Sequence, residues 1–120
     1  MITLYGISNC DSVKKAKKWL GDNEIVYAFH DFRVDGLTAK QIKAWLEHIP
    51  SEKLLNKRST TWKQLPDTLK NQLAADNAPI ALLVETMTEH PTLIKRPVLA
   101  ITNNNIQVGF SATHYQQLLS

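Results

Sequence analysis

One residue of this 120-residue chain can act as a sulfur nucleophile, because the sequence contains a single cysteine, Cys10. It follows an apolar stretch, residues 1–5, and it precedes a lysine-rich stretch. A thiol at a helix start lies beside unpaired backbone N–H groups and the positive end of the helix dipole, which favour the reactive thiolate. Free cysteines are also often buried and inert. Polar Asp11 and Ser12 fit a core position poorly, so we interpret Cys10 as a nucleophile.

The cysteine has no partner for an internal redox pair. Many redox proteins carry a second cysteine three residues after the first, which resolves a mixed disulfide within the molecule. This chain has Val13 at that position. Any disulfide of Cys10 must therefore involve a second molecule, and glutathione is the abundant cytoplasmic candidate.

The other residues that could carry chemistry form weaker patterns. The four histidines show no close metal-ligand spacing with one another or with Cys10, so we expect no metal site and no tightly bound cofactor. The sequence has neither a glycine-rich phosphate loop nor a Gly-x-Ser-x-Gly elbow. We interpret Arg33 as pairing with Asp31 or Asp35 rather than as a site residue.

Composition and charge are those of an ordinary globular protein, with 43% hydrophobic residues and 21% charged residues. The formal net charge of +3 is mild and its basic residues are spread along the chain, so we expect no direct nucleic-acid partner. No apolar run approaches the roughly 18 residues that cross a bilayer, and the N-terminal residues lack the signal-peptide pattern of a basic segment, an apolar segment and a small-residue cleavage site. We therefore expect a cytoplasmic protein of one domain, residues 1–120, without a membrane partner.

Periodicity places Cys10 between a short strand, residues 1–5, and a helix over residues 12–20. Residues 24–30 form a second strand that is apolar over residues 25–29, so we expect it to be buried and parallel to the first strand. On the intervening helix, the lysines at positions 14, 15, 17 and 18 should mainly face solvent.

The rest of the chain predicts a helical segment followed by a hairpin and a last helix. Thr38 and Gln41 form a capping box, and helices can start at residues 51, 66 and 79. Residues 98–101 pair with residues 106–108 across the turn at 103–105, and Ser111 caps a helix that covers the sheet through Tyr115, Leu118 and Leu119. The predicted order is βαβ, a helical insert, then ββα.

Four sequence blocks in this order are similar to those of the arsenate reductase-like family, most closely its Spx/MgsR/YffB-type branch. The blocks are residues 5–12, 27–37, 54–62 and 90–98. The resemblance implies an α/β, thioredoxin-like fold with a mixed four-stranded sheet and an all-helical insertion over about residues 38–90. It also implies a glutathione-dependent thiol reductase, with glutathione as co-substrate and glutaredoxin as a candidate partner.

The resemblance assigns a substrate site around Cys10. It implies a cis bond before Pro97, with Arg96 offering a guanidinium to carboxylates or oxyanions. From the residues alone, a surface arginine and an ordinary trans proline are the alternative. The match at Arg58 is looser, because the arginine of arsenate reductases falls at Asn56, so Arg58 would substitute for it. The polar neighbours of the cysteine, Asn9 and Ser12, complete the predicted site.

Two departures from authentic arsenate reductases weaken an arsenate-reducing activity. Gly6 stands where they have a histidine, and Phe110 stands where they have a third arginine. Three alternatives to a thiol reductase stay open. They are a Spx-like regulator that docks on RNA polymerase, an authentic arsenate reductase, and a member that keeps the fold without turnover.

Overall fold

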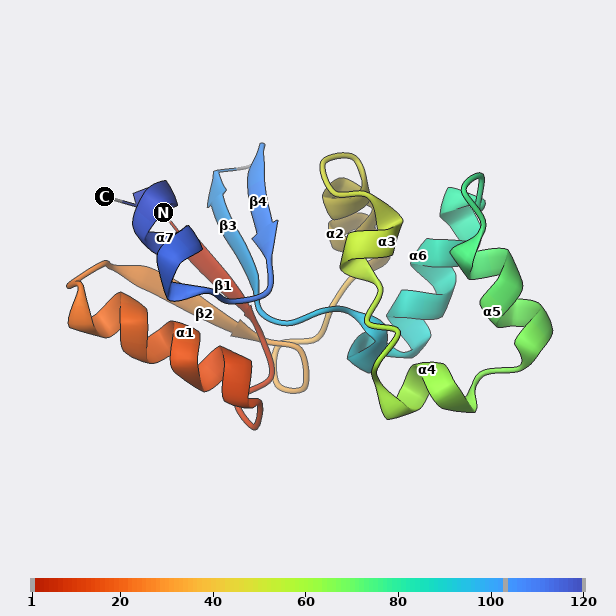
Figure 1. Ribbon diagram of the computed structural model, residues 1–120, viewed down its shortest axis with the longest axis horizontal. Coiled ribbons are helices and arrows are strands. Elements are labelled where there is room, and N and C mark those ends of the chain that lie inside the picture. The colour runs from red at the N-terminus through yellow and green to blue at the C-terminus, as the bar shows by residue number, and fades with distance from the viewer. Residues whose placement is uncertain (1, 103, 120) are drawn as a thin grey trace. The chain divides into compact units, whose positions relative to one another are not determined.

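The computed structural model describes residues 2–102 and 104–119, and the chain divides into two compact units. The first contains residues 1–36 and 96–120, and the second contains residues 37–95. The second unit covers the insertion predicted over about residues 38–90, and the single-domain organisation stays a prediction. The first unit contains β1 (Ile2–Gly6), α1 (Asp11–Asp22), β2 (Tyr27–Asp31), β3 (Val98–Thr102), β4 (Asn105–Val108) and α7 (Ala112–Leu119) (Figure 1).

The four strands form one mixed sheet in the order β2-β1-β3-β4. β1 pairs with β2 in parallel, which places Gly6 opposite Asp31. β1 pairs with β3 in antiparallel fashion, with Tyr5 opposite Val98, and β3 continues into the antiparallel hairpin strand β4. The predicted thioredoxin-like order and mixed sheet are confirmed, whereas the predicted turn residue at position 103 lies outside the described residues.

The expectation that the second strand is buried along its length is wrong. β2 begins at Tyr27 rather than at residue 24, and it is an edge strand with β1 as its neighbour. Ile25, Tyr27 and Phe29 pack against the core, whereas Val26 is 75% exposed. The continuous apolar run therefore contains the two-residue alternation of a strand that is buried on one face.

α1 and α7 cover the same face of the sheet, beside β1 and β3 (Figure 1). Fully buried core residues come from both layers, and they are Leu4, Leu99, Ala16, Leu20 and Tyr115. Each large apolar side chain removed from water in this way contributes about 1.5–3 kcal/mol. Ser111 caps α7 as predicted, because its hydroxyl accepts a hydrogen bond from the His114 N–H at 3.3 Å.

The second unit is helical, as predicted. Its elements are α2 (Ala39–Leu46), α3 (Ser51–Leu54), α4 (Thr60–Gln64), α5 (Asp67–Ala74), α6 (Ile80–Glu89) and a 3₁₀ turn, η1 (Pro91–Leu93). The Thr38 hydroxyl accepts a hydrogen bond from the Gln41 N–H at 3.2 Å, so this end of the capping box is confirmed. α3 begins at Ser51, and Pro66 and Pro79 are the N-cap residues of α5 and α6.

α2 packs against α6 in this unit, where Ile42, Trp45, Leu83 and Met87 are buried. One isolated antiparallel bridge, between Leu55 and Ile94, joins the segment after α3 to the segment after η1. Within the residues that the structure describes, no helix combines the length and apolar character needed to span a bilayer.

The Tyr115 hydroxyl group is buried in the core of the first unit and finds no hydrogen-bond partner among the described residues. Its ring makes edge-to-face contacts with Trp19 and Phe110, whose centroids lie 5.6 and 4.9 Å away. The ring therefore stabilises the core, whereas a buried hydroxyl without a partner costs free energy.

We expect Tyr115→Phe to keep the free energy of unfolding or to raise it by up to about 1 kcal/mol, because only the unpaired hydroxyl is removed. Tyr115→Ala should lower it by about 3–5 kcal/mol, since the ring contacts are lost as well. Urea unfolding monitored by circular dichroism measures both. A loss of more than about 1 kcal/mol in the phenylalanine variant would show that the hydroxyl forms a stabilising bond.

Candidate functional site

Cys10 is the N-cap residue of α1, and it is half-buried. Its backbone is extended, with φ −134° and ψ 128°, and its carbonyl accepts the hydrogen bond of the Lys14 N–H at 2.9 Å. A polar N-cap side chain normally accepts a hydrogen bond from the second or third helical N–H, here those of Ser12 and Val13. The Cys10 side chain makes no such bond within the described structure. These donors suit a thiolate at this position.

The strand register brings a second predicted feature to the same end of the sheet. Tyr5, near the end of β1, lies opposite Val98, the first residue of β3. The preceding residue, Pro97, is therefore next to the end of β1, from which the chain continues to Cys10. The Arg96–Pro97 peptide bond is cis, as the family resemblance implies. The residue after β4 supports this position, because the Pro97 carbonyl accepts a hydrogen bond from the Gly109 N–H at 2.9 Å.

The last residue of β1 must be small because α1 passes close to it. A Cβ atom at Gly6 would lie 2.6 Å from Cγ2 of Val13, a distance that real Cβ contacts essentially never show. Val13 is fully buried and its branched side chain has little rotamer freedom in a helix. The glycine that replaces the histidine of authentic arsenate reductases is therefore required for this packing of α1.

Asp31, the last residue of β2, connects that strand to the loop before Cys10. Its carboxylate is buried and accepts hydrogen bonds from the Arg33 N–H at 2.8 Å and from the Ser8 N–H at 3.3 Å. These N–H groups, with that of Arg33 the largest cause, hold the pKa of Asp31 below its usual value although burial opposes the shift. The Phe32 N–H also donates to the Gly6 carbonyl at 2.8 Å.

Sequence reasoning missed this role of Asp31. It predicted an ion pair between Arg33 and Asp31 or Asp35, but the described structure contains no ion pair of the Arg33 side chain, and the Arg33 backbone makes the contact instead. The only local signal was the spacing of two residues between the carboxylate and the N–H, which is typical of an Asx turn. The bond to Ser8 joins residues 23 positions apart and has no local signal.

The predicted site residues fall into two groups. Asn9 and Ser12 are exposed on either side of Cys10, and Arg96 is half-buried directly before the cis bond. These residues and Pro97 belong to the first unit. Arg58 is exposed in the second unit, where its N–H donates to the Asn56 side-chain oxygen at 3.2 Å. The binding roles of all these residues stay predictions.

Phe110 has a packing role in the first unit. It is half-buried, and its ring lies 4.9 Å from the Tyr115 ring at an interplanar angle of 81°. Both rings belong to the core that holds α7 on the sheet. A guanidinium at this position would replace an aromatic contact of the core.

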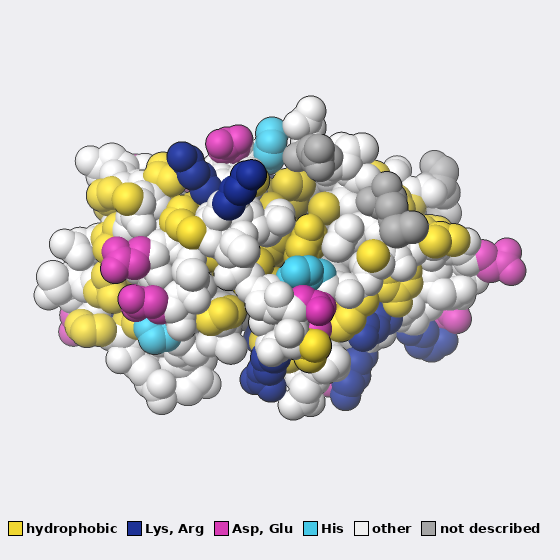
Figure 2. Space-filling model, turned by 180° about the vertical axis from the view of Figure 1, so that it is seen from behind, with side chains coloured by type: hydrophobic (Ala, Val, Ile, Leu, Met, Phe, Trp, Pro, Cys, Tyr) yellow, Lys and Arg dark blue, Asp and Glu magenta, His cyan; other side chains and the backbone are white. Residues whose placement is uncertain are grey.

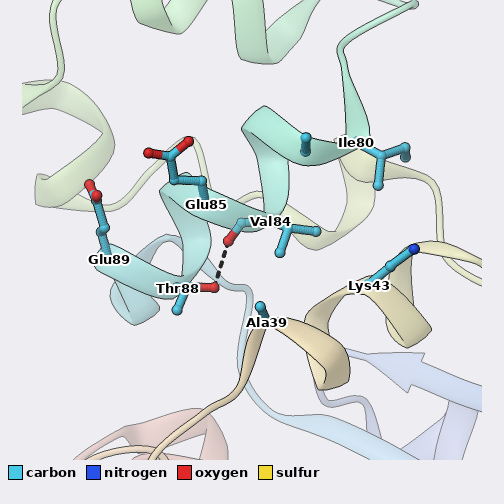
Figure 3. A pocket seen from close by; sticks show the side chains of 8 residues that line it. Ala39, Lys43, Ile80, Val84, Glu85, Thr88 and Glu89 are labelled. Atoms are coloured by element: carbon cyan, nitrogen blue, oxygen red, sulfur yellow. Dashed lines mark hydrogen bonds between the residues drawn. The ribbon is translucent and has the colours of Figure 1, made fainter.

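The second unit contains a groove of about 710 Å³ between α2 and α6 (Figure 3). Ile80, Ala81 and Val84 form its apolar part, and Glu85 and Lys43 contribute charges. The Thr88 hydroxyl is turned back onto its own helix, where it bonds to the Val84 carbonyl at 2.6 Å. None of the residues that line this groove belongs to the predicted site.

The charged surface is mixed in sign. On the face in Figure 2, Lys and Arg side chains form separate groups, with Asp, Glu and uncharged side chains between them. On α1 the lysines at positions 14, 15 and 18 are exposed as predicted, whereas Lys17 is half-buried, with Nζ 3.5 Å from the centroid of the Phe29 ring. Among the described residues, no group of three or more His, Cys, Asp or Glu side chains could hold a metal ion.

Comparison with known proteins shows similarity over nearly the whole chain. A family model described as the ArsC family matches residues 5–118. An uncharacterized protein of Haemophilus influenzae is 43% identical over 116 residues, which cover 97% of this chain and 96% of that protein. Global transcriptional regulator Spx 1 of Bacillus cereus is 29% identical over 121 residues, covering 99% and 87%. The solved structure of a YffB protein covers 100% of both chains, with a TM-score of 0.88 and 32% identity.

We expect Gly6→Ala to lower the free energy of unfolding by about 1–3 kcal/mol, because the added methyl group overlaps Val13. Combining it with Val13→Ala should cost less than the two single substitutions together, since the overlap is then removed. The matched control is Gly21→Ala, which adds a methyl group to the same helix with no atom within 4 Å. The control should gain roughly 0.5–1 kcal/mol. Additive effects of Gly6→Ala and Val13→Ala in urea unfolding would contradict the overlap.

Proposed function

The chain belongs to the ArsC family, and we propose that within this family it is a glutathione-dependent thiol reductase in which Cys10 is the nucleophile. The proposal rests mainly on one observation. Cys10 occupies the N-cap of α1, and Val13, the third residue of that helix, is fully buried and has no thiol. A nucleophile with helix N–H donors and without an internal partner requires an external thiol to complete a catalytic cycle.

The proposed reaction is two successive thiol-disulfide exchanges. The Cys10 thiolate attacks the glutathione sulfur of a glutathionylated substrate, so that a Cys10–glutathione disulfide forms while the old S–S bond breaks and the substrate leaves as a thiolate that takes up a proton. The thiolate of a second glutathione then attacks the mixed disulfide. It forms oxidised glutathione and regenerates the Cys10 thiolate. The two exchanges together convert the glutathionylated substrate and one free glutathione into the reduced substrate and oxidised glutathione.

The groups around Cys10 support this reaction by their chemistry. The α1 N-terminus stabilises negative charge on the sulfur, since its first N–H groups have no helical partner. Arg96, directly before the cis bond, suits a carboxylate of glutathione, and Asn9 and Ser12 offer polar side chains beside the sulfur. Arg58 would add a second cation. A glutaredoxin could replace the second glutathione, and a reducing compartment such as the cytoplasm would supply either thiol.

Reduction of arsenate is less well supported than thiol reduction. The position of the expected histidine is Gly6, whose neighbour Val13 leaves no room for a side chain. The position of the expected third arginine is Phe110, which is part of the aromatic packing around Tyr115. An oxyanion such as arsenate would therefore have fewer cationic contacts than in the authentic reductases.

The second candidate is a Spx-like regulator that binds RNA polymerase, and the 29% identity to Spx 1 of Bacillus cereus favours it. The two functions differ in their need for Cys10. A pull-down with purified RNA polymerase distinguishes them, since retention that is equal for the wild type and Cys10→Ser would support a regulator.

We expect oxidised glutathione to add one glutathione to the protein at Cys10, as measured by intact-protein and peptide mass spectrometry. Cys10→Ser should remain unmodified and should lose all turnover of a glutathionylated test peptide. Val13→Cys supplies the absent internal thiol, so its adduct should resolve to an internal disulfide between positions 10 and 13. Undiminished turnover in Cys10→Ser would end the proposal.

We expect Arg96→Ala to raise KM for glutathione about 10-fold, because a charge-assisted hydrogen bond to a carboxylate is lost. Steady-state kinetics with the glutathionylated test peptide measure the change. Arg33→Ala is the matched control, since this exposed arginine makes only a backbone contact to Asp31 in the described structure. Equal KM values for the wild type and Arg96→Ala would remove Arg96 from the binding site.

A further inference from the structure

We infer that Asp31 is a positioning residue for Cys10, because its buried carboxylate binds the Ser8 N–H and thereby holds the loop that places the sulfur at the N-terminus of α1. This inference rests on the proposed function, in which Cys10 reacts as a thiolate. It goes beyond that function by assigning a role to a residue outside the α1 N-terminus and outside the cis-proline segment.

The hydrogen bonds give Asp31 two sets of contacts. On one side, carboxylate atom Oδ2 accepts from Ser8 at 3.3 Å, two residues before the nucleophile. On the other side, Oδ1 accepts from Arg33 at 2.8 Å, and the Asp31 N–H donates to the Asp35 carboxylate at 3.0 Å. The Asp31 carbonyl also accepts the Asp35 N–H at 2.8 Å. Asp31 therefore links the turn after β2 to the loop after β1.

The burial of Asp31 explains why its link to Ser8 should hold the loop firmly. Asp31 is only 7% exposed, whereas Ser8 and Asn9 are exposed. A buried carboxylate that loses a hydrogen-bond donor is left partly unsatisfied, so loop movement away from Asp31 is penalised. The backbone bond from Phe32 to Gly6 holds the start of the loop but lies further from the cysteine.

Replacing Asp31 has two effects on the thiolate that differ in sign. Asp31→Asn removes a negative charge from the same end of the sheet, which by itself would favour the thiolate. It also replaces one accepting oxygen by an N–H₂ donor, which cannot accept a hydrogen bond from Ser8 and frees the loop. If the loop then moves off the helix N-terminus, the thiolate is disfavoured. The substitution leaves the other charged or titratable groups near this end unchanged. These are Tyr5, Asp11, Lys14, Lys15, His30, Arg33, Asp35 and Arg96.

The test is the pH profile of Cys10 alkylation by iodoacetamide, which is neutral and needs no glutathione site. In Asp31→Asn we expect the midpoint of the curve of alkylation rate against pH to move up by about 0.3–0.7 pH unit. At pH values below the midpoint, the alkylation rate should be about two- to fivefold lower than in the wild type. The rate at the high-pH plateau should not fall. Global destabilisation would not produce this pattern. Transient unfolding exposes the thiol and so would raise the alkylation rate at every pH, whereas the expected change lowers the rate at low pH only.

The matched control is Asp35→Asn, which removes a carboxylate from the same turn that has no contact with Ser8. Its alkylation midpoint should stay constant or move down, because this variant loses a charge and keeps the bond between Asp31 and Ser8. A midpoint that stays constant or moves down in Asp31→Asn would overturn the inference, because release of the loop would then not outweigh the loss of the negative charge. The alkylation profile remains informative even if no glutathione adduct forms, in which case the proposed function alone fails.

A measurement on the wild type covers the case in which Asp31→Asn does not fold. The amide NMR signals of Ser8 and Arg33 should titrate together with the Asp31 carboxyl, whose pKa lies below the ordinary value of about 3.9. Because the pKa is lower in the folded state, the Asp31 carboxylate stabilises the fold at pH values above the ordinary pKa of a free aspartate. This stabilisation is lost as the pH falls through the lowered pKa of the folded state. A Ser8 amide signal that does not follow the carboxyl would overturn the inference.

Discussion

The close approach of α1 to the end of β1 is the constraint on which the rest of the candidate site depends. With no side chain at Gly6, Val13 can lie against the strand, and only four residues separate the end of the strand from the start of the helix. Cys10 is then the N-cap of a helix packed directly on the sheet, which supplies N–H donors to its sulfur. The same packing occupies positions 6 and 13, where the family resemblance places a histidine and a second thiol in related proteins.

Strand pairing brings segments that are distant in sequence together at one end of the sheet. β1, β2 and β3 place the loop before Cys10, the Asp31 carboxylate and the cis bond at Pro97 at one end of the sheet. Each strand contributes one kind of group, a thiol, an acceptor for the loop N–H, or a proline preceded by a cation. This division is consistent with a fold in which the sheet is rigid and the chemistry is carried by its loops.

Much of the fold was predictable from local patterns. Thr38, Pro66 and Pro79 lie at helix starts because N-cap chemistry acts within one turn, and the hairpin after Val98 follows from two short strand signals. The burial of the second strand was not predictable, since a run of apolar residues does not reveal which faces of a strand are covered. Val26 is exposed although its neighbours pack into the core.

The sequence by itself determined that the chain has a single cysteine, that no thiol follows it three residues later and that a helix starts beside it, because these depend on residue type and on spacing within a few positions. Only the tertiary structure decided that Gly6 faces Val13 and that Asp31 binds the loop at Ser8. Both contacts depend on strand pairing, which joins distant residues without any signal in their local sequence. Pairing of β1 with β2 and β3 thus decides the surroundings of Cys10.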